Sequence, residues 1–459
     1  MTDRNRKFWN SEVETRSEKK VREIQVQKIR QQIARCYAAP GYYRDKFKEL
    51  GIVPDDIATW EDFRRLPILL TPDGYKQQQV DSLAEDGHPY GKILTCPLEK
   101  VVGVASTSGT TGQPSFYAYS RHDIAVSNEV LARAFWRVGI RPGETVLHGF
   151  GLSMWVAGIS MVRALEFMGA RPIPVGADGG TERLLLYARL TKPSTLFCTP
   201  SFAEYLIERV PELTGMQVGD LGIKRIFCAG EPGAGLPAVR RKLKDAWGAS
   251  IYDFNGGPWG ISNVSCEHEE YQGMHLLGED CSLHYDMVDP ETRKPIDIVN
   301  GAIGAAVLTA FDWEAAPPIK YMNNDLMQAF TEPCPCGMPG KRRKVMGRID
   351  DLLIVNGINV YPAAVKNIIN GYVPRVTGEL RIVLTEPPPR AASPLRIKVE
   401  RGSDTDPNAL DGLKKEITSK LRDLLQFNPA IEFVDPKSLS RSMLKGKMFE
   451  KRYEQTATR

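Results

Sequence analysis

The most informative stretch of this 459-residue chain is a nine-residue turn, Ser106-Thr107-Ser108-Gly109-Thr110-Thr111-Gly112-Gln113-Pro114. Five of its residues carry hydroxyl groups and two are glycines. The flanking residues 100–105 and 115–120 are rich in β-branched or aromatic side chains, which predicts two short strands. Glycines let backbone N–H groups approach an anion, and hydroxyl groups add further hydrogen-bond donors. The turn therefore predicts a phosphate-binding loop between two strands, with an ordinary surface turn as the alternative.

Further strands are expected downstream of the turn, and each leads into a glycine-rich or hydroxyl-rich segment. They cover residues 145–147, 171–175, 194–198 and 225–228. Helices are expected at 124–138, within 12–37 where the spacing is amphipathic, and as a buried helix in the apolar run 149–162. Strands that alternate with helices indicate parallel α/β layers, in which ligands lie beyond the carboxyl ends of the strands.

The composition sets limits on the class of protein. The chain is 42% hydrophobic and 25% charged, as in soluble globular proteins, and its length favours two domains. A net charge of +4 without a dense basic block does not indicate nucleic-acid binding. The charged N-terminus lacks the apolar core of a secretory signal, and the longest apolar run is too short to span a membrane. Eight cysteines do not suggest a disulfide framework, so we expect a cytoplasmic location.

The loop resembles the phosphate loop of the adenylate-forming superfamily, and the whole chain resembles its phenylacetate–CoA ligase branch. The resemblance runs from Phe8 to Lys447, and a second specific block reads GRIDDLLIVNGINVYP over residues 347–362. It implies an α/β fold with a large N-terminal domain, residues 1–349, built of layered sheets and helices that bind ATP and the acid. It also implies a small, mobile α+β lid domain at residues 350–459.

The resemblance assigns ATP binding to a set of loop and strand residues. They are Ser106, Thr107, Ser108, Gly109, Thr110, Thr111, Gly112, Gly230, Glu231, Pro232, Asp253, Phe254, Asn255 and Asp325. Three positions in or beside these segments depart from the family pattern: Gln113 replaces a lysine, Asn255 replaces an aromatic residue, and Trp259 replaces the glutamate that holds Mg²⁺. An indole offers no oxygen ligand, so another carboxylate (Glu231 or Glu267), the phosphates and water would hold the metal, or adenylation is impaired.

The remaining functional residues are also assigned by the resemblance. The acyl pocket would contain Phe150, Gly151, Met154, Trp155, Gly256 and Gly257, and Gly357 would line the coenzyme A tunnel. Lys447 is the expected catalytic lysine, with Lys445 as the alternative, and Arg348 should reach the ribose or phosphates of the nucleotide. Asp350 should be the hinge residue. Aromatic and sulfur side chains suit a flat apolar acid, although such a cluster is also typical of a plain core.

A metal site is a separate expectation from the residue types. Cys266 is followed by a histidine, either His268 or His275, and later by Cys334 and Cys336. Three thiolates and one imidazole form a closed tetrahedral set of the kind that binds structural zinc. The resemblance favours His275 as the histidine, and unpaired buried cysteines are the alternative.

The expected activity is that of an AMP-forming acid–CoA ligase. A small-molecule carboxylic acid would react with ATP and Mg²⁺ to give an acyl-adenylate, which coenzyme A would convert to a thioester. Transfer to an amine, a carrier-protein thiol or nitrite is one alternative, and a degenerate, non-catalytic homologue is another. A homodimer is the assembly to test. Lys366 stands where the family often has glutamate, and its side chain is expected on the surface.

Overall fold

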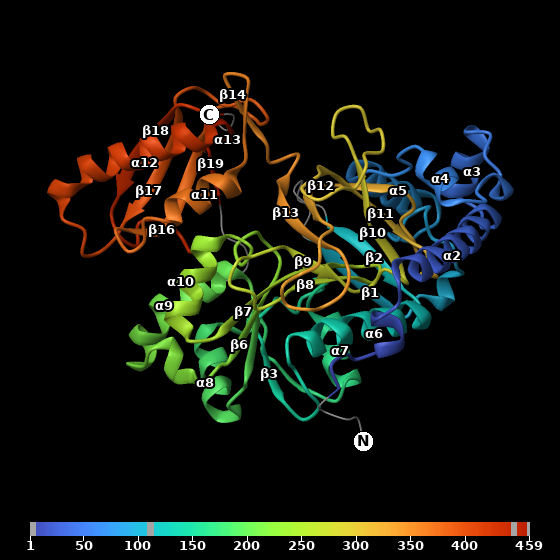
Figure 1. Cartoon of the computed structure of the whole chain (residues 1–459), viewed down its shortest axis with the longest axis horizontal. Helices are drawn as coiled ribbons and strands as arrows, with labels where there is room; N and C mark the ends of the chain where they lie inside the picture. The colour runs from blue at the N-terminus through green and yellow to red at the C-terminus, as the bar shows by residue number, and fades with distance from the viewer. Residues whose placement is uncertain (1–5, 108–113, 442–447, 457–459) are drawn as a thin grey trace. The chain divides into compact units, whose positions relative to one another are not determined.

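The computed structural model describes residues 6–107, 114–441 and 448–456, which form two compact units (Figure 1). The first unit contains the chain up to residue 197 together with residues 222–227 and 252–344. The second contains residues 198–221 and 228–251 and the chain from residue 345 onward. The predicted α/β class is confirmed, and the domain boundary between residues 349 and 350 stays a prediction.

Many helices of the first unit begin at a residue whose side chain caps the helix. The helices of this unit are α1 (Ser11–Glu14), α2 (Glu18–Ala38), α3 (Tyr42–Glu49), α4 (Trp60–Arg65), α5 (Pro72–Glu85), α6 (Arg121–Arg137), α7 (Ile159–Phe167) and α8 (Thr181–Thr191). At the start of α6, Ser120 Oγ accepts from Asp123 N and the Asp123 carboxylate accepts from Ser120 N, which forms a capping box. The helix predicted at residues 124–138 is therefore confirmed with its N-terminus three residues earlier.

The two strands predicted beside the phosphate loop form an antiparallel pair, β1 (Gly103–Thr107) and β2 (Ser115–Tyr119). A larger mixed sheet has the strand order β10-β11-β12-β13-β9-β8-β7-β6-β5-β3-β4. Its strands are β3 (Thr145–His148), β4 (Arg171–Pro174), β5 (Thr195–Cys198), β6 (Arg225–Cys228), β7 (Ser250–Gly257), β8 (Ile261–Ser265), β9 (Met274–Leu276), β10 (Ser282–Val288), β11 (Ile303–Ala310), β12 (Tyr321–Phe330) and β13 (Arg342–Arg348). The pairs β3–β4 and β3–β5 are parallel, as predicted.

The buried helix predicted over residues 149–162 was largely wrong. Helix α7 begins only at Ile159, and residues 149–158 have irregular backbone. A side chain at Gly158 would lie 2.6 Å from the carbonyl oxygen of Gly151, and Met154 has a φ of 64°. These local conformations exclude a continuous helix, although the segment is apolar.

The C-terminal part of the second unit contains a four-stranded sheet of order β18-β17-β16-β19, drawn in orange and red in Figure 1. The elements of this unit are α9 (Pro200–Thr214), α10 (Pro237–Trp247), β14 (Leu353–Val355), β15 (Ile358–Val360), α11 (Pro362–Asn370), β16 (Val376–Leu384), β17 (Leu395–Arg401), α12 (Leu410–Leu425), β18 (Pro429–Val434), β19 (Phe449–Lys451) and α13 (Arg452–Thr456). Leu413, Ile417 and Leu421 of α12 share a buried core with strands β16 and β17.

Within the described ranges, none of the helices combines the length and the apolar character that a bilayer crossing requires.

Candidate functional site

The described part of the phosphate loop lies against the segment predicted to form the acyl pocket. Ser106 and Thr107 end strand β1, and Ser106 N donates to the carbonyl oxygen of Met154 at 2.5 Å. Ser106 also pairs with Trp155 in a parallel bridge. The other predicted loop residues, 108–112, and the two lysine candidates Lys445 and Lys447 lie outside the described residues. Sequence positions about 50 residues apart thus meet where the loop begins.

The predicted pocket residues differ in their exposure. Phe150 is buried, and its ring centroid lies 5.2 Å from that of Trp155 and 6.2 Å from that of Phe197. Trp155 is half-buried, and Met154 is 44% exposed. Phe150 is therefore part of the aromatic core, whereas Met154 and Trp155 have surface available for a ligand. Gly151 belongs to the same irregular segment.

Strand β7 carries the predicted adenine-site residues, and side chains from neighbouring segments hold two of them. The Asp253 carboxylate accepts from Tyr271 Oη at 2.6 Å, and Asn255 Oδ1 accepts from Arg343 at 2.6 Å. Phe254 instead packs into the core, with its ring centroid 4.7 Å from that of Phe227. The glycine at position 256 is required because a Cβ there would lie 2.3 Å from the Phe254 ring. The next residue, 257, ends the strand.

Sequence reasoning missed Lys344 of β13, whose charge interacts with that of Asp253 on β7. Its Nζ is 5.6 Å from the centroid of the Tyr271 ring. Burial lowers the pKa of Lys344, while the nearby Asp253 carboxylate acts in the opposite direction. A cation that faces Asp253 from β13 could not be found by a local motif, because 91 residues separate the two positions.

Trp259 lies in a core of tyrosine rings. Its ring centroid is 5.2 Å from that of Tyr117, 5.6 Å from that of Tyr321 and 5.8 Å from that of Tyr75, all with edge-to-face geometry. The residue is 4% exposed and has a φ of 73°, which is unusual for a side chain of this size. The indole therefore fills a hydrophobic space and has no role as a metal ligand.

The predicted ribose ligand, Asp325, lies on strand β12. Its Oδ2 accepts from Asn323 Nδ2 at 2.8 Å, and its backbone N–H donates to Asn323 Oδ1 at 3.1 Å. The residue is half-buried. This local contact orients the carboxylate, and a carboxylate can accept from both hydroxyl groups of a vicinal diol.

The other predicted nucleotide and hinge residues belong to the second unit. Glu231 follows Gly230, which has a φ of 93°, and precedes Pro232. Its Oε1 accepts from Ser201 N at 2.8 Å in the first turn of α9, where backbone N–H groups and the helix dipole favour a carboxylate. Glu267, the other carboxylate considered for Mg²⁺, belongs to the first unit and is exposed.

The hinge candidates Arg348 and Asp350 form an ion pair with each other. Arg348 Nε donates to Asp350 Oδ1 at 2.9 Å, and its terminal nitrogen donates to Oδ2 at 2.6 Å. Asn356 and Gly357, at the tip of the β14–β15 hairpin, both have positive φ, of 51° and 81°. Positive φ at both central residues is typical of a type I′ turn, which explains the Asn-Gly pair.

The expectation that Lys366 lies on the surface was wrong. Its side chain is buried, and Nζ lies 3.5 Å from Glu204 Oε2. The same carboxylate accepts from Lys242 Nζ at 2.9 Å through Oε1. Burial would raise the pKa of Glu204, but the two ammonium groups outweigh this effect and lower the pKa to about 2. No local sequence signal marks this cluster, because Glu204 and Lys366 are 162 residues apart.

The four predicted zinc ligands come together in the first unit. One ligand atom from each of Cys266, His275, Cys334 and Cys336 lies within 4.8 Å of all the others. Cys266 Sγ and Cys334 Sγ are 3.8 Å apart, and Cys336 Sγ lies 3.4 Å from His275 Nε2. His268 is not part of this group, and its ring Nδ1 lies 3.2 Å from the carbonyl oxygen of Glu270.

These separations match those required by tetrahedral zinc. A Zn–S bond of about 2.3 Å places two thiolate ligands about 3.8 Å apart, and a Zn–N bond of about 2.0 Å gives a sulfur–nitrogen separation of about 3.5 Å. Burial lowers the pKa of His275 to about 3, so the imidazole is neutral at pH 7. The donor set therefore fits zinc in chemistry and in spacing.

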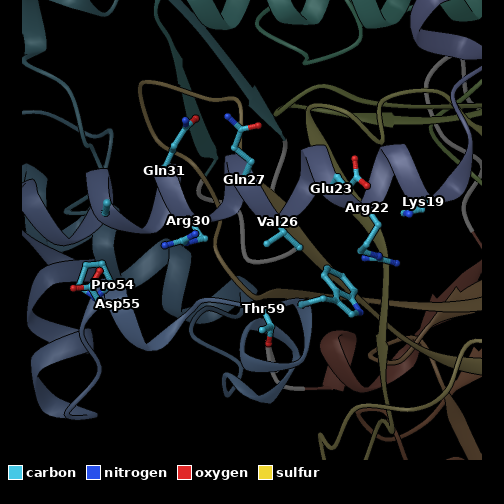
Figure 2. A pocket seen from close by; sticks show the side chains of 12 residues that line it. Lys19, Arg22, Glu23, Val26, Gln27, Arg30, Gln31, Pro54, Asp55 and Thr59 are labelled. Carbon is cyan, nitrogen blue, oxygen red and sulfur yellow. The ribbon is translucent and has the colours of Figure 1, made fainter.

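A separate groove of about 840 Å³ lies between α2 and residues 54–60. Figure 2 shows Arg22, Val26 and Arg30 on the helix side and Thr59 opposite them. The guanidinium of Arg22 lies 3.5 Å from the centroid of the Trp60 ring. None of the predicted site residues lines this groove.

The similarity to known proteins extends along nearly the whole chain. Residues 357–452 match the family model of the AMP-binding enzyme C-terminal domain. The phenylacetate-coenzyme A ligase of Thermus thermophilus is 28% identical over 454 residues, which cover 95% of this chain and 97% of that protein. The phenylacetate-coenzyme A ligase of Escherichia coli is 26% identical over 362 residues, which cover 76% of each chain.

The solved structures give the same result for the fold. 2-Hydroxyisobutyryl-CoA ligase in the postadenylation state, in complex with 2-HIB-AMP, superimposes with a TM-score of 0.88 at 25% identity, covering 100% of this chain and 96% of that one. The same enzyme with 2-HIB-AMP and CoA in the thioesterification state gives a TM-score of 0.69, covering 100% and 97%. The similarity spans the N-terminal sheet, the zinc-ligand cluster and the C-terminal sheet in one alignment. Over nearly its whole length this chain is therefore similar to phenylacetate-coenzyme A ligases, and its fold is that of a solved adenylate-forming CoA ligase.

Proposed function

We propose that the protein is an AMP-forming ligase that joins a small aromatic carboxylic acid to coenzyme A. The observation that carries the proposal is the similarity to phenylacetate-coenzyme A ligases over 95% of the chain. The half-buried Trp155 and the exposed Met154, beside the start of the phosphate loop, support an apolar acid.

The reaction has two steps. A carboxylate oxygen of the acid attacks the α-phosphorus of ATP, the bond to the bridging oxygen breaks, and pyrophosphate leaves. The sulfur of coenzyme A then attacks the acyl carbon of the adenylate, the thiol proton passes to solvent, and AMP leaves. Neither step requires a covalent bond to the protein, so the side chains act by positioning and charge stabilisation.

The proposed roles follow from the chemistry of each residue. Residues 106–112 hold the phosphates, Asp325 accepts from the ribose hydroxyl groups, and Lys447 stabilises the charge that develops on the phosphates. Arg348 has a guanidinium suited to phosphate or ribose oxygens. Magnesium would be held mainly by phosphates and water, which is its usual preference, because Trp259 offers no oxygen atom and is enclosed by tyrosines.

The test is pyrophosphate release from ATP and Mg²⁺ with a panel of acids that includes phenylacetate, benzoate and 2-hydroxyisobutyrate. We expect release with an aromatic acid and thioester formation when coenzyme A is added. Release without any thioester would favour transfer to another nucleophile. No release with any acid at any Mg²⁺ concentration would refute the proposed activity and favour a non-catalytic homologue.

We also propose that Cys266, His275, Cys334 and Cys336 bind one structural zinc ion. The spacing of the ligand atoms supports this assignment, and four protein ligands leave no open position for catalysis. Protein prepared with ample zinc and without chelator should contain about one equivalent by elemental analysis. A trace amount only would refute the site. We place the enzyme in the cytoplasm, where the eight free cysteines would stay reduced.

A further inference from the structure

Helix α9 carries three glutamates at a spacing of four residues. Glu204, Glu208 and Glu212 therefore lie on one side of the helix, and we call them the acidic stripe. Like charges four residues apart destabilise an isolated helix by about 0.2–0.5 kcal/mol per pair. The stripe is thus favourable only where cations face it.

Three cations that face the stripe come from the C-terminal part of the same unit, in addition to Arg209, which pairs with Glu212, and Lys242, which pairs with Glu204. Lys366 of α11 lies 3.5 Å from Glu204, Arg441 lies 3.0 Å from Glu208, and Lys437 pairs with Glu212. These three cations belong to different points of the chain between residues 362 and 441. Helices α10 and α11 lie side by side in the same region (Figure 1).

The middle pair has the most ordered geometry. Two nitrogens of Arg441 contact Glu208, at 3.0 and 3.3 Å, and two contact Glu400 of β17, at 2.7 and 2.9 Å. Glu400 is fully buried and also accepts from Leu439 N at 3.1 Å. Glu400 therefore orients the guanidinium from within the C-terminal part, and the ion pair with Glu208 links the same guanidinium to α9.

Glu204 differs from Glu208, because it has a second cation on the neighbouring helix. Lys242 of α10 lies 2.9 Å from Glu204 and donates to the carbonyl oxygen of Thr377 at 2.8 Å. Removing Lys366 would thus leave Glu204 paired. The Glu208 side chain is 36% exposed. Removing its charge leaves no buried ion without a partner, because Arg441 still pairs with Glu400.

Arg441 stands six residues before Lys447, the proposed catalytic lysine. We propose that Glu208 is a positioning residue for adenylation, because its ion pair with Arg441 holds the C-terminal part of the chain against α9. The inference rests on the proposed function and on the predicted mobility of residues 350–459 between the two half-reactions. The similar 2-hydroxyisobutyryl-CoA ligase has been solved in both a postadenylation and a thioesterification state.

The test is Glu208→Gln, which keeps the size of the side chain and removes its charge. Each half-reaction is measured alone: pyrophosphate release from phenylacetate and ATP, and thioester formation from pre-made phenylacetyl-adenylate and coenzyme A. We expect the first rate to fall roughly tenfold, as for loss of one charge-assisted contact, and the second to change less than twofold. Glu208→Asp, which retains the charge, should recover part of the first rate.

The matched control is Glu416→Gln. It removes an ion pair with Arg375 at 2.8 Å that lies wholly within the C-terminal part, with both side chains 50% exposed. It should alter neither half-reaction. An equal fall of both rates in Glu208→Gln, with a lower thermal midpoint than the control, would show a structural role and overturn the inference.

An unchanged pyrophosphate rate in Glu208→Gln would also overturn it. Both outcomes can be distinguished from failure of the proposed function. In that case the wild-type protein itself releases no pyrophosphate with any acid, and the inference about Glu208 is refuted as well.

Discussion

Replacement of Trp259 tests the assignment of this residue to the core. Loss of a buried tryptophan typically costs about 3–5 kcal/mol of stability, and Trp259 is 4% exposed among three tyrosine rings. The backbone adds a second effect, because a φ of 73° costs about 1–2 kcal/mol for a residue with a Cβ and little for glycine. Glycine loses about 0.5–1 kcal/mol relative to alanine through the entropy of the unfolded chain. From the midpoints of these two ranges, Trp259→Gly should be more stable than Trp259→Ala by about 0.75 kcal/mol.

The assay is urea unfolding followed by circular dichroism at 222 nm, since seven tryptophans would complicate a fluorescence signal. Both variants should lose stability relative to the wild type, with alanine the less stable of the two. Alanine equal to or more stable than glycine would refute the argument from the backbone, and a cost below about 1 kcal/mol for either variant would refute the core assignment.

The burial of Trp259 among tyrosine rings also predicts how a substitution there affects the magnesium requirement. Trp259→Glu would place a carboxylate among aromatic rings, where an unpaired charge is unfavourable. We expect it to destabilise the protein at least as much as Trp259→Ala, without lowering the Mg²⁺ concentration needed for half-maximal pyrophosphate release. A lower Mg²⁺ requirement in a folded variant would show that position 259 reaches the metal.

Three further outcomes are expected. The Glu204 carboxyl, with a pKa of about 2 in the folded protein against 4.5 normally, should contribute roughly 3 kcal/mol above pH 4.5 that is lost as the pH falls towards 2. Glu204→Gln should remove this part of the pH dependence in acid unfolding curves, and identical curves would contradict the assignment. Cys336→Ser should lower the zinc content measured by elemental analysis and the thermal midpoint, whereas Cys96→Ser, outside the ligand set, should change neither. Lys447→Ala should reduce pyrophosphate release roughly 100- to 10,000-fold while thioester formation from pre-made adenylate persists; equal losses would indicate a structural lysine.

The parts of the fold that could be predicted are those set by local patterns. The strands at residues 145–148, 195–198 and 225–228 were found because short β-branched and aromatic runs end in turn residues. The helix predicted at residues 124–138 is confirmed, but the Ser120 cap, which begins it three residues earlier, was not predicted. The segment 149–158 was assigned to a helix because it is apolar, but its backbone depends on close contacts at Gly158 and on a positive φ at Met154.

In the candidate site, too, residues marked by a sequence pattern could be predicted, whereas residues fixed by partners far away in the sequence could not. The cluster of three cysteines and one histidine could be predicted because these residue types have few common alternatives in such a pattern, and His275 rather than His268 is favoured by the resemblance. The burial of Lys366 and the enclosure of Trp259 could not be predicted. Each depends on partners far away in the sequence, Glu204 in the first case and Tyr75 and Tyr117 in the second.

The acidic stripe has a consequence for ionic strength. If residues 350–459 leave α9 during thioester formation, Glu208 and Glu212 lose their C-terminal partners and face solvent within two helical turns of Glu204. Dissolved salt screens the repulsion among these carboxylates and weakens the attraction of Arg441 and Lys437 for them. Both effects favour separation, so rising salt should shift the balance of the two half-reactions towards thioester formation, even with every substrate at saturation.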